Sequence, residues 1–285
     1  MSSSGQAVSN PFILMHISDL HFHRLPRHPS AYLSKRALGA LNLLLRRGRE
    51  FPLERARGLV KRLEQVSWHH LVISGDLTQL GTPAEFALAR EVFATLLARG
   101  PEQVTVIPGN HDKYVAEKEG QSAFEAYFGE FSPAASAPPR LLGGNWWLAA
   151  WDSAQPAPWN SAEGCVPAET LLATKSWLDG RPTGSQLIVA NHYPVFFPSG
   201  HSQAPAHGLV NHDTVRAWLL NHPVRLYLHG HVHQNWVLTV EGNHGSLTVV
   251  NSAASTSRPA VAGASSFHRI VLDGGEFRVE PQHLE

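Results

Sequence analysis

Short clusters of Asp, Asn and His side chains recur along the chain, each directly after an apolar run. The clearest lies at residues 104–112, where a run rich in Val and Ile ends at a Pro-Gly pair and is followed by Asn110, His111 and Asp112. Such a run is typical of a buried strand, and α/β sheets place their chemistry at the carboxyl ends of such strands. Taken alone, this cluster is equally compatible with a polar loop that uses Asn and Asp for turns.

Four further clusters repeat the arrangement and together indicate a metal centre. They are Asp19-x-His21 after residues 12–17, Gly75-Asp76 after 68–73, His192 after 185–190, and His231-x-His233 after 224–228. On an extended segment, the side chains of Asp19 and His21 would point the same way because they are two residues apart. Oxygen and imidazole donors without thiolates suit Mn, Fe, Zn or Co. Seven donors exceed the needs of one tetrahedral ion, so the set predicts two ions that share a bridging carboxylate.

These clusters need parallel strands to bring them together, and the apolar pattern supplies such strands. The first part of the chain alternates predicted strands (12–17, 68–73, 104–107) with predicted helices (52–66, 82–99), an order that predicts a doubly wound α/β core. Thr82 and Glu85 form a capping-box pattern at the start of the second helix. The rest predicts helices at 114–131, 168–178 and 211–221 and strands at 145–152, 185–192, 224–228, 236–240, 247–250, 267–272 and 276–279.

Length and composition fit one large α/β domain or two small ones. We expect a single domain at residues 11–285, after a disordered polar tail at 1–10. Cys165 is the only cysteine, which excludes a disulfide framework and a Cys-based zinc site. The first ten residues have no apolar h-region, and no stretch reaches the length of a membrane span. These features predict a cytoplasmic location.

A basic segment interrupts the domain after the first predicted strand. Residues 24–62 hold 11 basic residues and two acids, although the whole chain has a formal net charge of zero. Within it, residues 30–51 carry Leu and Ala at helical spacing, which predicts an amphipathic helical insertion. Two interpretations remain open. The helix packs on the domain, or it contacts an anionic membrane or a lipid substrate through 31–51, which would place the protein at the inner membrane surface.

The order D-x-H, G-D, G-N-H-D, H and G-H-x-H resembles the calcineurin-like metallophosphoesterases over about residues 12–235. The resemblance implies a four-layer α-β-β-α sandwich with two mixed sheets flanked by helices. It implies that the first metal is bound by Asp19, His21, Asp76 and His233, and the second by Asp76, Asn110, His192 and His231. Asp76 would bridge the two ions, with Mn as the preferred metal and Fe, Zn or Co as the others.

The resemblance also implies a catalytic role for His111, which would protonate the leaving group without binding metal. Asp112 would orient the loop or His111. His23 and His229 flank ligand positions and are candidates for substrate contact.

The implied reaction is hydrolysis of a phosphodiester or pyrophosphate bond by in-line attack of a metal-bridging hydroxide. The G-N-H-D loop and the length resemble cyclic-nucleotide phosphodiesterases of class III. The basic insertion favours a UDP-2,3-diacylglucosamine pyrophosphohydrolase of lipid A synthesis, although one form of that enzyme has Arg where His111 stands. A non-catalytic scaffold is the third interpretation, but such scaffolds lose ligands that are all present here. The expected partner is a small phosphoester or a lipid-nucleotide substrate. No specific binding of nucleic acid is expected.

Overall fold

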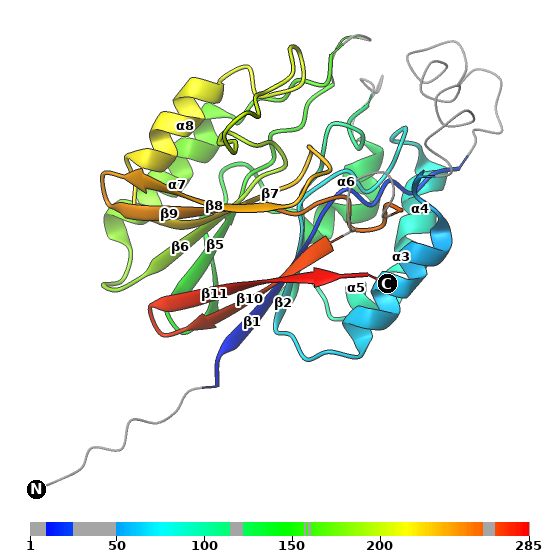
Figure 1. Cartoon of the computed structure of the whole chain (residues 1–285), viewed down its shortest axis with the longest axis horizontal. Helices are drawn as coiled ribbons and strands as arrows, with labels where there is room; N and C mark the ends of the chain where they lie inside the picture. Colours follow the sequence, from blue (N-terminus) through cyan, green and yellow to red (C-terminus); the bar gives the residue numbers. More distant parts are fainter. Residues whose placement is uncertain are drawn as a thin grey trace, which may run out of the picture.

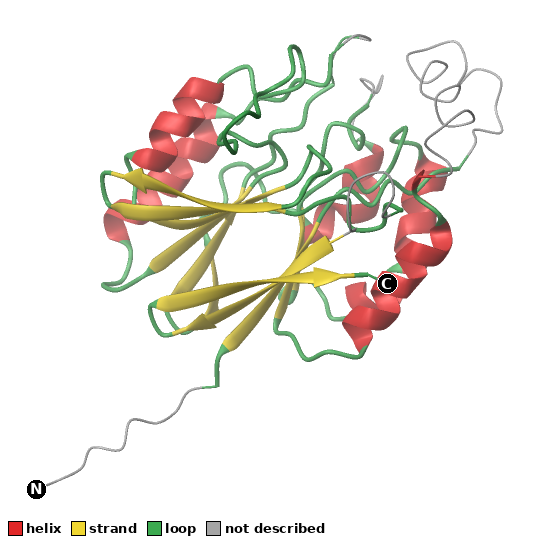
Figure 2. Ribbon diagram, viewed as in Figure 1, coloured by secondary structure: helices red, strands yellow, loops and turns green. Residues whose placement is uncertain are grey.

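Two β-sheets face each other between two groups of helices in the computed structural model of the chain (Figures 1 and 2). The structure describes residues 10–24, 50–114, 122–156, 158, 161–258 and 266–284. The predicted tail, apart from Asn10, and the predicted insertion up to residue 49 lie outside the described residues. The two facing sheets between two groups of helices confirm the four-layer α-β-β-α arrangement that the resemblance implied.

The first sheet has the strand order β11-β10-β1-β2-β3, in which β1, β2 and β3 are parallel. Its strands are β1 (Phe12–Ile17), β2 (His70–Ile73), β3 (Val104–Val106), β10 (Ser266–Asp273) and β11 (Glu276–His283). The accompanying helices are α3 (Leu53–Glu64), α4 (Pro83–Val92), α5 (Ala94–Leu97), α6 (Ala123–Phe128) and the 3-10 helix η3 (Gly129–Phe131).

The second sheet has the strand order β4-β5-β6-β7-β9-β8, with β5, β6, β7 and β9 parallel. Its strands are β4 (Arg140–Gly143), β5 (Trp146–Ala150), β6 (Gln186–Ala190), β7 (Val224–His229), β8 (Trp236–Gly242) and β9 (Gly245–Asn251). Helices α7 (Ala168–Gly180) and α8 (His212–Leu220) cover its outer face.

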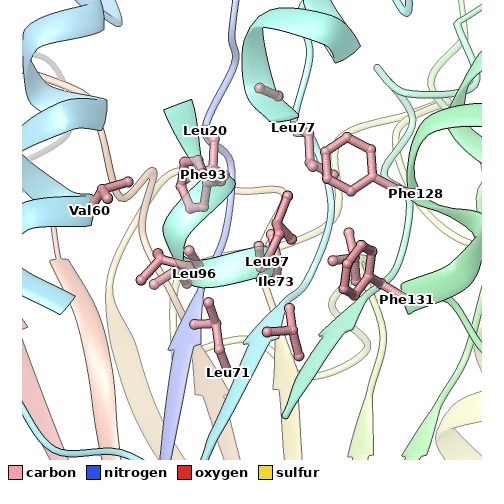
Figure 3. Close-up of a cluster of buried hydrophobic side chains, with 14 of the residues drawn as sticks. Leu20, Val60, Leu71, Ile73, Leu77, Phe93, Leu96, Leu97, Phe128 and Phe131 are labelled. Carbon is pink, nitrogen blue, oxygen red and sulfur yellow. The ribbon is translucent and has the colours of Figure 1, made fainter. Parts of the chain in front are cut away.

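Three apolar layers hold this sandwich together, and their alternation is visible on β2. Leu71 and Ile73 pack against the helices of the first sheet, whereas Val72 packs against the second sheet. Figure 3 shows part of the outer layer, in which Phe93 and Leu96 belong to the same cluster as Leu71 and Ile73 of β2. The expectation of a doubly wound core was wrong, because a second sheet and not helices covers the inner face. A strand that is buried on both faces reads as one apolar run whichever element covers it.

Outside the insertion, the predicted helices are present in the structure, with differences in their bounds. The capping box is present, since Glu85 donates its N–H to Thr82 Oγ1 at 3.3 Å and Thr82 donates its N–H to Glu85 Oε2 at 3.1 Å. The predicted helix at 82–99 is divided into α4 and α5 at Phe93, and the one at 114–131 is helical only from Ala123 among the described residues. Strand β4 was not predicted. None of the helices in the described part of the chain has the length and apolar composition needed to cross a bilayer.

Candidate metal centre

The carboxyl ends of the parallel strands of both sheets converge on one cluster of polar side chains. Asp19, His21, Asp76 and His233 each offer a donor atom, and these atoms all lie within 4.8 Å of one another. The Nε2 atoms of His21 and His233 are 2.9 Å apart, and His233 Nε2 is 3.3 Å from Asp19 Oδ1. The sequence therefore brings together the four donors expected for the first metal.

The four residues expected for the second metal also meet. Asn110 Oδ1 lies 3.2 Å from His192 Nε2 and 2.9 Å from His231 Nδ1. Asp76 joins the two groups, since its Oδ2 is 3.8 Å from His21 Nε2 and its Oδ1 is 3.5 Å from His192 Nε2. A carboxylate with one oxygen toward each group has the geometry of a bridging ligand.

The donor set fits a pair of divalent cations. Lone-pair donors crowd together in each group, and an ion between them would satisfy several at once. Hard oxygen and imidazole donors without sulfur are suited to Mn, Fe, Zn or Co. The residues present are therefore compatible with the two divalent ions of the prediction.

The backbone of these ligands is unusual. Among the described residues, six non-glycine residues have positive φ, and five of them are predicted ligands: Asp19, His21, Asp76, His231 and His233. The left-handed region costs an L-residue on the order of 1–2 kcal/mol and is found mainly where function requires it. The expectation that Asp19 and His21 share one side of an extended segment was wrong, because two left-handed residues, at φ 54° and 49°, direct them instead.

Two motif glycines allow the loops to approach the carboxylates. A Cβ atom on Gly109 would overlap Oδ1 and the backbone nitrogen of Asp76, and one on Gly230 would overlap Ser18 Oγ and Asp19 Oδ2. The glycines of G-N-H-D and G-H-x-H are therefore required by close packing against the carboxylates of the centre.

Backbone carbonyls orient the histidines of the second group. His192 donates from Nδ1 to the Ser74 carbonyl at 2.8 Å, and His231 donates from Nε2 to the His207 carbonyl at 2.6 Å. Each bond leaves the other ring nitrogen directed at Asn110, which is the support that metal-binding histidines usually have. Sequence reasoning missed these partners because a carbonyl leaves no residue-type signal.

Burial and charge set the protonation of the centre. Burial raises the pKa of Asp19 and Asp76, but the surrounding histidines outweigh it and hold both pKa values well below the usual range. Burial lowers the pKa of His192, but the Asp76 carboxylate outweighs that effect and raises the pKa to about 9. Burial and the charge on His192 lower the pKa of His231 to about 3. Without a cation, His192 therefore carries the proton that balances Asp76.

His111 lies beside the centre without joining either group of donors. Its backbone N–H donates to Asp76 Oδ1 at 2.8 Å, and its Nδ1 donates to the Gln79 carbonyl at 2.7 Å. Its ring meets His21 edge-on at 5.0 Å between centroids and stacks on Tyr114 at 5.6 Å. The bond from Nδ1 to the Gln79 carbonyl fixes the orientation of the ring beside the centre.

Asp112 holds together the loops that carry Asp76 and His111. Its carboxylate accepts hydrogen bonds from the N–H groups of Leu77, Thr78 and Gly109 at 2.9–3.1 Å, and from Thr78 Oγ1 at 2.9 Å. Burial, together with the charge of Asp76, raises its pKa to about 7. These bonds agree with the alternative in which Asp112 orients the loop, and its role in catalysis stays a prediction.

Neither of the two candidates for substrate contact is among the donors of the two groups. His229 is 0% exposed and packs against the rings of Tyr227 and Trp236, so the expectation that it touches substrate is corrected. His23 is half-buried and lines a cavity of about 170 Å³ together with Phe51. It occupies an apolar side pocket and not the polar cluster.

The comparisons with known proteins agree with this geometry. A family model described as calcineurin-like phosphoesterase matches residues 12–235. The "Probable cyclic nucleotide phosphodiesterase" of a Synechococcus species is 30% identical over 189 residues, a stretch that spans 64% of this chain and only 65% of that relative.

Solved structures share the fold at low identity. Purple acid phosphatase PPD1 from yellow lupin has a TM-score of 0.58 at 12% identity, with 96% of this chain and 52% of that chain covered. The sulfate thiohydrolase SoxB from Thermus thermophilus has a TM-score of 0.53 at 12% identity, with 97% and 57% covered. The chain thus spans little more than half of these larger proteins.

Proposed function

Because the chain belongs to the calcineurin-like phosphoesterase family, we propose that it is a dinuclear metal-dependent hydrolase of phosphodiester or pyrophosphate bonds. The observation that carries this proposal is the placement of Asp76. One of its oxygens faces His21 and the other faces His192, so a single carboxylate serves both groups of donors. When bound, two divalent cations would supply Lewis-acid activation of water and of the phosphoryl group.

The protein itself contributes position and protons. The first cation would be held by Asp19, His21, Asp76 and His233, and the second by Asp76, Asn110, His192 and His231. His111 would donate a proton from Nε2 to the departing ester oxygen, because its Nδ1 is held by Gln79. Asp112 keeps the loop of His111 against the loop of Asp76. Mn is the proposed metal, with Fe, Zn or Co as alternatives.

A cyclic nucleotide is the first substrate to test, because the 30% identical relative carries that activity in its name. The second candidate is a lipid-nucleotide pyrophosphate at a membrane surface. It is favoured by the basic stretch at 24–62, of which Arg57, Lys61 and Arg62 are exposed on α3. The predicted contact of 31–51 with an anionic membrane stays a prediction.

The experiment is a hydrolysis screen with the purified protein. The protein is stripped with a chelator, reloaded with Mn²⁺, and given bis-p-nitrophenyl phosphate, cyclic nucleotides, UDP-linked lipids and nucleoside pyrophosphates. We expect Mn²⁺-dependent hydrolysis of bis-p-nitrophenyl phosphate and of one natural class. Absence of hydrolysis by reloaded protein that binds two Mn²⁺ ions would refute the proposed function.

A further inference from the structure

The ring of His21 is held differently from the rings of His192 and His231. Its Nε2 points into the first group of donors, 2.9 Å from His233 Nε2. Its Nδ1 is buried and has no hydrogen-bond partner in the part of the chain that the structure describes. Metal-binding histidines nearly always donate this second nitrogen to a carbonyl, a carboxylate or water. Among the described residues, aromatic rings pack against the His21 ring outside the donor group.

Phe51 makes the closer of these two edge-on contacts, the other being with the His111 ring at 5.0 Å. Its ring lies edge-on to the His21 ring, with centroids 4.6 Å apart at 62°, and edge-on to the His233 ring at 5.7 Å and 76°. Phe51 is 4% exposed, so its ring is packed and not mobile in solvent. Of the histidines expected to bind metal, Phe51 contacts the two that belong only to the first group. Edge-to-face packing of this kind restrains ring rotation without a hydrogen bond.

The backbone around Phe51 is tied to the loop that it supports. Arg258 donates its N–H to the Glu50 carbonyl at 2.9 Å, and Ser255 in the same segment donates its N–H to the Ser18 carbonyl at 3.0 Å. One short segment therefore binds the residue before Phe51 and the residue before the first ligand. The Phe51 ring thus has a defined position relative to that loop.

Phe51 also separates His21 from an apolar cavity. The cavity has a volume of about 170 Å³ and is lined by Phe51, Leu20, Leu53 and Ala56 among others. A smaller side chain at position 51 would join this space to the edge of the His21 ring. The ring would then gain room to rotate, and its Nε2 would leave the first group of donors for part of the time.

We propose that Phe51 is a positioning residue that sets the metal affinity of the first group of donors by packing on His21 and His233. The inference rests on the proposed function in that it assumes that two cations bind. The histidines of the two groups of donors are then oriented by different contacts. Carbonyl hydrogen bonds orient the second, whereas an aromatic ring orients the first.

The test compares Mn²⁺ binding by the wild-type chain and by Phe51→Leu, measured as free Mn²⁺ by electron paramagnetic resonance. We expect Phe51→Leu to lower the affinity for one of the two Mn²⁺ ions by about 10- to 100-fold, the range typical for loss of a group that orients a ligand. The affinity for the other ion should be unchanged. Phe51→Tyr keeps the ring edge, so its Mn²⁺ affinities should stay within about 3-fold of the wild-type values.

Phe93→Leu is the matched control. Phe93 is 2% exposed, meets the ring of Phe22 at 5.7 Å, and lies in the outer apolar layer shown in Figure 3. The substitution Phe93→Leu should remove a comparable amount of buried apolar contact and leave both Mn²⁺ affinities unchanged. Phe51→Met, whose flexible side chain can fill the space without a ring, serves if Phe51→Leu does not fold.

Three outcomes would overturn the inference. Unchanged affinity for both ions in Phe51→Leu or Phe51→Met would show that the ring does not position His21. Equal weakening in Phe93→Leu would show a general effect of core loss, as would equal weakening of both ions by the Phe51 variants. A wild-type chain that binds no Mn²⁺ would instead refute the proposed function, on which the inference depends.

Discussion

Raising the pH from 7 to 9 should destabilise the metal-free protein through His192. Burial opposes a charge on this imidazole, but the Asp76 carboxylate, 3.5 Å from its Nε2, raises its pKa to about 9. The ring is held by the bond from Nδ1 to the Ser74 carbonyl, so the proton that titrates is on Nε2. The folded state therefore binds a proton that the unfolded chain releases near its ordinary pKa of about 6.5.

The sign and size follow from linkage. A raised folded-state pKa contributes stability that is fully present below the unfolded pKa and is lost as the pH rises through the folded pKa. At about 1.4 kcal/mol for each unit of pKa shift, the loss between pH 7 and 9 is about 2 kcal/mol. For a chain of this length that corresponds to a fall of about 3–4 °C in Tm. Burial raises the pKa of Glu85 and Asp112 to about 7, so their losses fall mostly below this window.

Thermal unfolding in EDTA at pH 7, 8 and 9, followed by tryptophan fluorescence, measures this loss. His192→Asn should abolish the slope, and His201→Asn, at an exposed histidine, should keep it. Mn²⁺ should also abolish the slope, because a cation replaces the Nε2 proton. A calorimetric titration in two buffers should then detect about one proton released at pH 7. A metal-free protein whose Tm is constant or rises from pH 7 to 9 would contradict the assigned proton position.

Three substitutions test the rest of the centre. Asp76→Asn should lower hydrolysis of bis-p-nitrophenyl phosphate by more than about 100-fold and should leave fewer than two Mn²⁺ ions bound after dialysis; a fully active variant would exclude a bridging role. His111→Ala should keep both ions and lower kcat about 100-fold or more for alkyl esters, with a smaller loss for nitrophenyl esters; loss of metal would show that His111 is a ligand. Gly109→Ala should lower Tm and Mn²⁺ affinity, because the added Cβ overlaps Asp76. Gly180→Ala, at the open end of α7, should leave both unchanged. Equal Tm values for the two variants would contradict the close packing of Gly109 on Asp76.

The seven donors could be predicted from sequence because each combines two independent signals. A strand that is buried on both faces is a continuous apolar run, as at Leu71, Val72 and Ile73. Side chains that follow parallel strands meet at one edge of a sheet, so Asp76 and Asn110 were expected to converge before any contact was known. The apolar pattern also predicted most strands of the second sheet, but only the resemblance to a family placed that sheet against the first one.

The supports of the donors were not predictable from sequence. Ser74, Gln79 and His207 act through backbone carbonyls, and any residue type offers one. Phe51 is the last residue of the predicted insertion at 30–51, and in the sequence it looks like an ordinary apolar residue before α3. His229 shows the reverse error, because proximity in sequence to His231 indicated a substrate contact and the structure buries it.

The left-handed ligands explain why the motif glycines and Asp112 matter as much as the donors. Five strained ligands would relax if their loops were free, since each costs on the order of 1–2 kcal/mol and a whole domain is stable by only about 5–15 kcal/mol. The loops are not free. Asp112 binds the Asp76 loop at Leu77 and Thr78, and the Gly109 backbone packs directly on the Asp76 carboxylate. The donors are therefore placed by the packing of the protein before a cation arrives, so cations would meet an organised centre and not assemble one.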